Sequence, residues 1–261
     1  MLLKNKRIVL TGAAGGMGEL LAWELSERGA RLILTDLNEQ RVVQLAKDMG
    51  DKHVGVGADL CAAEGREALL NACQNFGGVD ILINAAGMSE FALLENQSPE
   101  KLELMTRINL IAPMQLCQSL LPLLSKSSEA AIVNIGSTFG AIGHPGFAAY
   151  CATKAGLRGF TQALRRELAD TSMKVFYIAP RAVQTDMNSE AVVELNRELG
   201  NTMDKPELVV SSMLGLLSSK PGGDYFLGWP EKLFVRVNAL IPGVVDSALG
   251  KQLSTIKRLA V

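Results

Sequence analysis

The chain has 261 residues, 48% of them hydrophobic, and its 26 basic and 27 acidic side chains give a net charge of −1. This length and apolar content suffice for a large buried core, and the charge gives no electrostatic footprint for nucleic acid. The four cysteines have no metal-binding spacing, and no apolar signal sequence separates Met1 from Lys4. We therefore expect a soluble, cytoplasmic protein without a metal site and without nucleic acid as a partner.

An apolar strand, a glycine-rich turn and a helix open the chain. Residues 7–11 form the strand, and the turn is Gly12-Ala13-Ala14-Gly15-Gly16-Met17-Gly18, followed by a helical pattern that closes at Gly29. Glycines let the backbone approach a pyrophosphate, and the free N–H groups at a helix start attract its charge. The segment therefore predicts half of a nucleotide-binding βαβ unit.

A second apolar strand, residues 30–35, ends in Asp36. An acidic residue about twenty positions beyond the glycines can accept hydrogen bonds from a ribose 2′-hydroxyl, and it repels a 2′-phosphate. The nearest cation, Arg41, falls a turn into the next helix, where it is poorly placed to bind that phosphate. We therefore predict NAD as the cofactor in preference to NADP.

Apolar strands and helical stretches alternate through the rest of the chain, with strands at residues 79–83, 131–135, 174–178 and 224–228. Continuous apolar strands are typical of a parallel sheet whose two faces are both covered. The uncharged stretch 108–125 is interrupted by amides and prolines, so it predicts a buried helix or a subunit contact and not a membrane span.

Ser137, Tyr150 and Lys154 place a hydroxyl, a phenol and an ammonium within eighteen residues. If this stretch is helical, Tyr150 and Lys154 share one face because residues four apart lie one turn apart. A phenol has a pKa of about 10, and a nearby cation lowers it toward the range useful for acid–base catalysis. The spacing therefore predicts a proton-transfer site.

These motifs, taken in order, resemble those of the short-chain dehydrogenase/reductase family. The glycine turn matches Thr-Gly-x-x-x-Gly-x-Gly, Asn84-Ala85-Ala86-Gly87 approximates Asn-Asn-Ala-Gly, and Tyr150 with Lys154 matches Tyr-x-x-x-Lys. The resemblance covers about residues 4–228. It implies a single-domain, Rossmann-like, doubly wound α/β fold, with a seven-stranded parallel sheet and helices on both faces. The resulting division is an NAD-binding catalytic domain over residues 1–228 and an amphipathic helical extension over residues 229–261.

The resemblance also implies a role for each site residue. Tyr150 is the general acid/base, and Lys154 lowers its pKa and binds the nicotinamide ribose. Ser137 holds the substrate oxygen, and Asn109 holds a water that links Lys154 to solvent. The cofactor-binding positions that it implies are Gly12, Gly15, Gly16, Met17, Gly18, Asp36, Asp59, Leu60, Asn84, Ala85, Ala86, Gly87, Tyr150, Lys154, Pro180 and Thr185.

Two features depart from the family pattern. Arg181 follows Pro180 where the family usually has glycine, and we expect its side chain to face solvent or to offer a cation to an anionic substrate. The chain also continues past the last strand, with apolar residues at helical spacing on either side of Pro242-Gly243, which predicts two short helices. This tail can pack on its own subunit or a partner, close over a hydrophobic substrate, or dock on a membrane surface. The preceding segment, residues 188–203, is predicted to form a mobile flap with few polar groups.

These observations favour an NAD(P)-dependent oxidoreductase that interconverts a secondary alcohol and a ketone on an uncharged, lipophilic small molecule. One alternative is a reductase of 3-oxoacyl thioesters or steroid-like carbonyls. A non-catalytic nucleotide sensor is another, because a fold alone does not establish activity. By resemblance, we expect a homo-oligomer, either a dimer or a tetramer.

Overall fold

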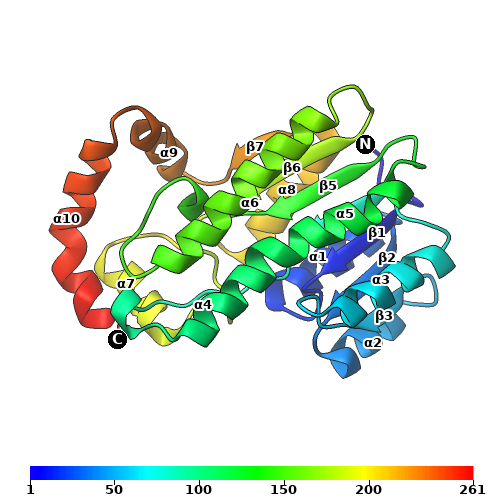
Figure 1. Ribbon diagram of the computed structural model, residues 1–261, viewed down its shortest axis with the longest axis horizontal. Helices are drawn as coiled ribbons and strands as arrows, with labels where there is room; N and C mark the ends of the chain where they lie inside the picture. The colour runs from blue at the N-terminus through cyan, green and yellow to red at the C-terminus, as the bar shows by residue number, and fades with distance from the viewer. Residues whose placement is uncertain (261) are drawn as a thin grey trace.

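A single parallel sheet forms the centre of the molecule (Figure 1), which is a computed structural model that describes residues 1–260. The strands are β1 (Arg7–Thr11), β2 (Arg31–Asp36), β3 (Val54–Gly57), β4 (Ile81–Asn84), β5 (Ala131–Ile135), β6 (Lys174–Ala179) and β7 (Gly223–Phe226). Their order in the 7-stranded sheet is β3-β2-β1-β4-β5-β6-β7, and all neighbouring strands are parallel. The predicted Rossmann-like parallel sheet is therefore confirmed.

Helices cover both faces of the sheet, and each face has its own apolar core. On one face lie α1 (Gly16–Glu27), α2 (Glu39–Asp48) and α8 (Pro206–Ser219). On the other lie α3 (Ala63–Asn75), α5 (Ala112–Leu124) and α6 (Ala148–Glu167). The central strands are mainly apolar because both of their faces are covered, and β5 is buried at every position.

The uncharged stretch 108–125 forms a π-helical turn, Arg107–Ile111, that continues directly into α5. Leu116, Leu120 and Leu124 of α5 are buried in the core against the sheet. Over residues 1–260, no helix combines the length and apolar content needed to cross a membrane.

The remaining helices gather around the carboxyl edge of the sheet: α4 (Pro99–Thr106), α7 (Glu190–Glu198), α9 (Glu231–Leu240) and α10 (Pro242–Leu259), with the 3₁₀ turns Leu94–Asn96 and Thr138–Gly140. One expectation for the tail was wrong, because α10 is not short and begins at Pro242 itself. Proline suits the first helical turn, where its missing N–H would have no partner. In Figure 1, α10 leaves α9 and returns to α7, so the tail arches along one side of the molecule.

The chain reverses its direction of travel across the sheet between β1 and β4, since β2 and β3 lie on one side and β4 to β7 on the other. Ligands of such sheets bind beyond the carboxyl ends of the strands near this switch point. The glycine turn follows β1, Asp36 ends β2, and Ser137 follows β5. The sheet thus brings the predicted cofactor and catalytic residues to one edge.

Candidate active site

A cavity of about 920 Å³ opens at this edge of the sheet. Its lining begins at the glycine turn, passes Ser137 and Tyr150, and ends on α9 and α10. Every residue that we predicted to bind the cofactor lines it, with the exception of Asn84. One continuous cavity can therefore hold both ligands. We call the part beside the glycine turn the nucleotide half and the part beside α9 and α10 the substrate half.

Close backbone packing explains the glycines at two positions of the turn. Gly12 has φ +67, and a Cβ there would lie 2.8 Å from Cα of Ala86. A Cβ on Gly18 would overlap the carbonyl oxygen of Gly12. The Thr11 hydroxyl accepts hydrogen bonds from the backbone N–H groups of Ala85 and Ala86, both at 3.0 Å. The glycine turn and the segment after β4 are thereby held together.

The turn also has the features that a dinucleotide pyrophosphate requires. Gly15 precedes α1 without a side-chain cap, so the first N–H groups of this 12-residue helix are open to an anion. An added Cβ at Gly16 would meet no protein atom within 4 Å, which leaves its surroundings open. The residues present therefore fit a dinucleotide.

Asp36 lies beside the turn, and its carboxylate already has two backbone partners. One oxygen accepts from the N–H of Ala14 at 3.1 Å and the other accepts from the N–H of Asn38 at 3.1 Å. Arg41 is paired with Glu19 at 2.9 Å. The nearest predicted cation is therefore bound to a carboxylate.

Asn84 is placed differently from the other predicted cofactor residues. Its amide is buried and donates to the side chain of Asn134 at 2.8 Å, and Asn134 donates in turn to Thr161 at 2.9 Å. The Asn84 side chain therefore links β4 to β5 and, through Asn134, to α6, and it does not line the cavity. A cofactor contact through this side chain stays a prediction without geometric support.

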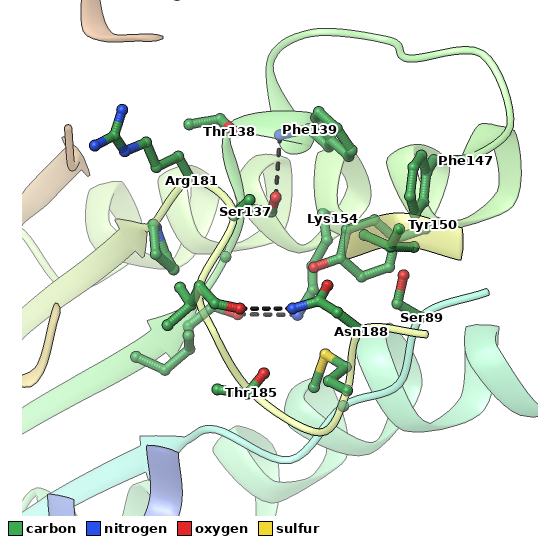
Figure 2. A pocket seen from close by; sticks show the side chains of 18 of the residues that line it. Ser89, Ser137, Thr138, Phe139, Phe147, Tyr150, Lys154, Arg181, Thr185 and Asn188 are labelled. Atoms are coloured by element: carbon green, nitrogen blue, oxygen red, sulfur yellow. Dashed lines mark hydrogen bonds between the residues drawn. The ribbon is translucent and has the colours of Figure 1, made fainter. Parts of the chain in front are cut away.

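Ser137, Tyr150 and Lys154 converge on the middle of the cavity (Figure 2). The Ser137 hydroxyl accepts from the N–H of Phe139 at 3.1 Å, and it lies near enough to the Tyr150 phenol to lower the pKa of that phenol. Lys154 donates to the carbonyl oxygen of Ile135 at 3.0 Å, and its Nζ lies 5.8 Å from the centre of the Tyr150 ring. Helix α6 thus places phenol and ammonium on one face, as their spacing predicted.

The pKa of Tyr150 departs from the prediction. Burial raises the pKa of Tyr150 to about 12 and outweighs the effect of the Ser137 hydroxyl, which lowers it. Burial also lowers the pKa of Lys154 to about 8. The predicted lowering of the phenol pKa is therefore wrong for the chain by itself, because desolvation disfavours the charged form of both groups.

Asn109 lies in the π-helical turn and is fully buried. Its amide oxygen accepts from the N–H of Met88 at 2.9 Å, and its amide nitrogen donates to the carbonyl oxygen of Met88 at 2.8 Å. Single π-helical turns often mark functional sites. Asn109 does not itself line the cavity, and its role in holding a water stays a prediction.

Tyr177 of β6 supports the site, although the sequence analysis did not single it out. Its buried hydroxyl donates to the carbonyl oxygens of Ser137 at 3.1 Å and Lys154 at 3.2 Å, and accepts from the N–H of Ser137 at 3.2 Å. A Cβ on either Gly136 or Gly140 would overlap this tyrosine. The signal in the sequence that could have pointed to Tyr177 is a tyrosine hydroxyl in a strand whose neighbouring residues are apolar.

Aromatic and aliphatic side chains form the far wall of the cavity. Phe139 and Phe147 lie 6.4 and 6.3 Å from the Tyr150 ring, measured between ring centres, and His144 stacks on Phe139 at 4.9 Å. From other segments come Val192, Leu195, Phe234, Val237, Val245 and Leu249. The substrate half is therefore mainly apolar.

Arg181 lies at the rim, where both expectations for it were wrong. Its guanidinium is ion-paired with Asp204 at 2.6 Å and with Glu231 at 3.3 Å, and only 13% of the side chain is exposed. It faces neither open solvent nor an unoccupied anion site, because two carboxylates from distant parts of the chain already neutralise it.

Lys154→Met is expected to change how stability depends on pH. The pKa of Lys154 is about 8 when folded against 10.5 for the free side chain, so between these values the unfolded chain binds more protons. The stability of the native protein relative to Lys154→Met should therefore rise by about 2 kcal/mol between roughly pH 7.5 and 9.5. Urea unfolding of both proteins across this range measures it, and a pH-independent difference would contradict a buried ammonium.

The fold and this site together define a nicotinamide-dependent oxidoreductase. A family model described as short chain dehydrogenase matches residues 6–196. The chain belongs to this family, and it is an NAD(P)-dependent enzyme that binds a nicotinamide cofactor.

Individual relatives agree with this assignment. The chain is 36% identical to the 3-oxoacyl-[acyl-carrier-protein] reductase FabG of Vibrio cholerae over 188 residues, which are 72% of this chain and 77% of the relative. It is 34% identical to carbonyl reductase family member 4 of Danio rerio over 221 residues, 82% of this chain and 92% of the relative.

Among solved structures, a 3-ketoacyl-(acyl-carrier-protein) reductase from Brucella melitensis complexed with NADH superposes with a TM-score of 0.79 and 25% identity. The match covers 88% of this chain and 99% of that chain. A short-chain dehydrogenase/reductase from Burkholderia phymatum in complex with NAD has a TM-score of 0.82 at 20% identity, covering 92% and 94% of the two chains, which supports the fold.

Proposed function

We propose that this enzyme interconverts a secondary alcohol and a ketone on an uncharged, lipophilic small molecule, with NAD as the preferred cofactor and Tyr150 as the general acid/base. The observation that carries the proposal is the position of Ser137, Tyr150 and Lys154 between the glycine turn and the apolar wall of one cavity. A substrate carbonyl beside Tyr150 would have the rest of the molecule against aromatic and aliphatic side chains.

In this proposal Tyr150, Ser137 and Lys154 each have a separate role. A bound nicotinamide would supply or accept the hydride, and its oxidised form would carry a positive charge. Tyr150 donates a proton to the carbonyl oxygen in reduction and takes the hydroxyl proton in oxidation. Ser137 donates a hydrogen bond to the same oxygen and stabilises its developing charge. Lys154 stabilises the phenolate after the proton has left.

The raised pKa of Tyr150, about 12, supports the reductive direction near neutral pH. A phenol with this pKa stays protonated and is ready to donate. Oxidation requires the phenolate, which a cationic ring beside Tyr150 would favour. We therefore expect the rate of alcohol oxidation to rise with pH and ketone reduction to need no deprotonation of Tyr150.

The charges around the cavity support an uncharged substrate. Among the described residues that line it, the cationic side chains are Lys154 and Arg181. Lys154 is buried beside the Tyr150 ring, and Arg181 is paired with two carboxylates. An anionic substrate would find acidic neighbours in Asp186 and Glu231.

Acyl thioester reduction is the second candidate. It is favoured by the relatives named as 3-oxoacyl-[acyl-carrier-protein] reductases. A panel of neutral aliphatic ketones, steroid-like ketones and 3-oxoacyl thioesters, followed by the absorbance of reduced nicotinamide, separates the candidates. Turnover of bulky neutral ketones with the highest kcat/KM supports the first proposal, thioester preference supports the second, and no turnover of any compound would contradict both and favour a nucleotide sensor.

Asp36→Asn tests the cofactor preference. The native carboxylate is expected to repel a 2′-phosphate, so kcat/KM should favour NADH over NADPH by about tenfold or more. The amide removes the charge but keeps an oxygen that can accept from the N–H of Ala14, so the preference should shrink with little loss of stability. An NADPH preference in the native enzyme would contradict the assignment.

A homo-oligomer is also part of the proposal. Leu104, Ile111 and Met114 are large apolar side chains left 47%, 41% and 39% exposed on α4, the π-helical turn and α5. A second subunit would bury them. Light scattering of the purified protein measures the mass, and a monomer at micromolar concentration would contradict this expectation.

A further inference from the structure

Arg181 joins β6 to the segment between α7 and α8. Its Nε donates to one carboxylate oxygen of Asp204 at 2.9 Å and its Nη2 donates to the other at 2.6 Å. Such a two-point pair fixes both the distance and the orientation of the guanidinium. Figure 2 shows the side chain directed away from Tyr150, so Arg181 does not reach the reacting groups.

The same guanidinium also holds the start of the tail. Its Nη1 donates to the carbonyl oxygen of Trp229 at 2.8 Å and to the Glu231 carboxylate at 3.3 Å. Gly228 leaves room for the arginine stem, because a Cβ there would lie 2.8 Å from Cδ of Arg181, at φ +88. One side chain therefore joins three segments that are distant in sequence.

The three segments differ in how much they depend on Arg181. Backbone hydrogen bonds already tie Asp204 to the loop after β6, through its N–H to Ala182 at 2.8 Å and its carbonyl to the N–H of Gln184 at 2.9 Å. Up to residue 260, the tail has no backbone hydrogen bond of this kind beyond Leu227, whose N–H donates to Ala179 at 2.8 Å. The link that only the arginine side chain supplies is the one to Trp229 and Glu231.

The far end of the tail has a separate anchor. Ile256 of α10 is fully buried with Phe147, Val192 and Leu195, and Arg258 pairs with Glu198 of α7. Between the two anchors, α9 buries Val235, and α10 buries Val245 before it reaches Ile256. Phe234, Val237, Val244 and Leu249 in this stretch line the cavity. In the same stretch, the Asn238 amide donates to the carbonyl oxygen of Ala141 at 2.9 Å. The tail is therefore an arch over the substrate half, fixed at its two ends and joined once in between, through Asn238.

We propose that Arg181 is a positioning residue that fastens the tail over the substrate half of the cavity and so sets the affinity for bulky lipophilic substrates. The proposal rests on the proposed function for the nature of the substrate. Its physical basis is that one guanidinium binds the Asp204 carboxylate on one side and the Trp229 carbonyl and the Glu231 carboxylate of the tail on the other. Arg181 acts through Phe234 and its neighbours and does not touch the reacting atoms.

Arg181→Gln is the primary test, because glutamine keeps a polar side chain but loses the charge and the two-point pairing. We expect KM for bulky ketones to rise about tenfold or more, while kcat, KM for a small ketone such as acetone and the Kd for NADH change by less than about threefold. Arg181→Lys should restore part of the loss by keeping the charge. Glu231→Gln, a milder change that weakens only the tail link, should shift KM in the same direction.

Hydrogen exchange gives a readout that is independent of turnover. In Arg181→Gln, amides of residues 231–240 should exchange faster, whereas the amides of Gln184 and Asp204 should stay protected by their own backbone partners. Arg7→Gln is the matched control, because Arg7 makes the same two-point pair with Asp80, at 2.9 and 2.8 Å, and neither residue lines the cavity. It should lower stability without changing KM or exchange in the tail.

Two results would overturn the proposal: unchanged exchange in residues 231–240, or KM values that rise equally for small and bulky ketones. If the native enzyme turns over no ketone, the proposed function fails instead, and the exchange experiment still decides whether Arg181 holds the tail.

Discussion

Replacing Tyr150 by phenylalanine should reduce kcat by at least about 10²–10⁴-fold, the usual contribution of a general acid–base group, while the Kd for NADH stays within about threefold of the native value. The ring would remain packed beside Phe139 and Phe147, so the change removes one oxygen and leaves the cavity wall in place. Steady-state kinetics and a fluorescence titration of NADH measure the two quantities.

A second tyrosine serves as the control for this substitution. The Tyr225 hydroxyl donates to the carbonyl oxygen of Pro221 at 2.7 Å near the surface, and the residue does not line the cavity. Tyr225→Phe removes the same atom and should leave kcat unchanged. If Tyr150→Phe retained native turnover, the proton-transfer role would have to be given to another group.

Gly18→Ala is the second change expected to have a large effect. The new methyl group would overlap the carbonyl oxygen of Gly12, and backbone on both sides prevents either partner from moving aside. Overpacking of this kind costs about 1–3 kcal/mol, and it should displace the start of α1 from the cofactor turn. We expect Tm to fall by several degrees and the Kd for NADH to rise about tenfold or more, since tenfold corresponds to about 1.4 kcal/mol.

Gly16→Ala is the matched control in the same turn. Its added methyl group would meet no protein atom within 4 Å, so Tm should stay at the native value. A loss of NADH affinity without a loss of Tm would then place the pyrophosphate beside Gly16. Differential scanning fluorimetry and NADH titration measure both variants, and equal Tm values for Gly18→Ala and the native protein would contradict the overlap.

Local patterns accounted for the features that the sequence predicted well. The central strands are short, mainly apolar runs, so their positions follow from composition over a few residues, as with residues 131–135, which are all buried. The glycine turn and the face shared by Tyr150 and Lys154 depend on spacing within a single turn or helix. Such features need no knowledge of distant segments.

The tail illustrates what local patterns leave open. Helical spacing predicted amphipathic helices after residue 229, and packing on a subunit was the favoured placement, but a lid over the substrate and docking on a membrane also fitted that pattern. Contacts between Ile256 and Phe147, more than a hundred residues apart in sequence, place α10 over the cavity. An apolar face on a helix predicts that this face is buried. Which part of the molecule buries the face depends on the fold.

The apolar strands, the cofactor turn and the alignment of Tyr150 with Lys154 follow from the order of residues along the chain, because each depends on neighbouring residues. Contacts between distant segments account for the other features of the site. Burial raises the pKa of Tyr150, Asn84 turns into the core toward Asn134, and Arg181 meets Asp204 and Glu231 from 23 and 50 residues away. Desolvation and long-range pairing depend on which surfaces the fold brings together, and residue order along the chain does not reveal them.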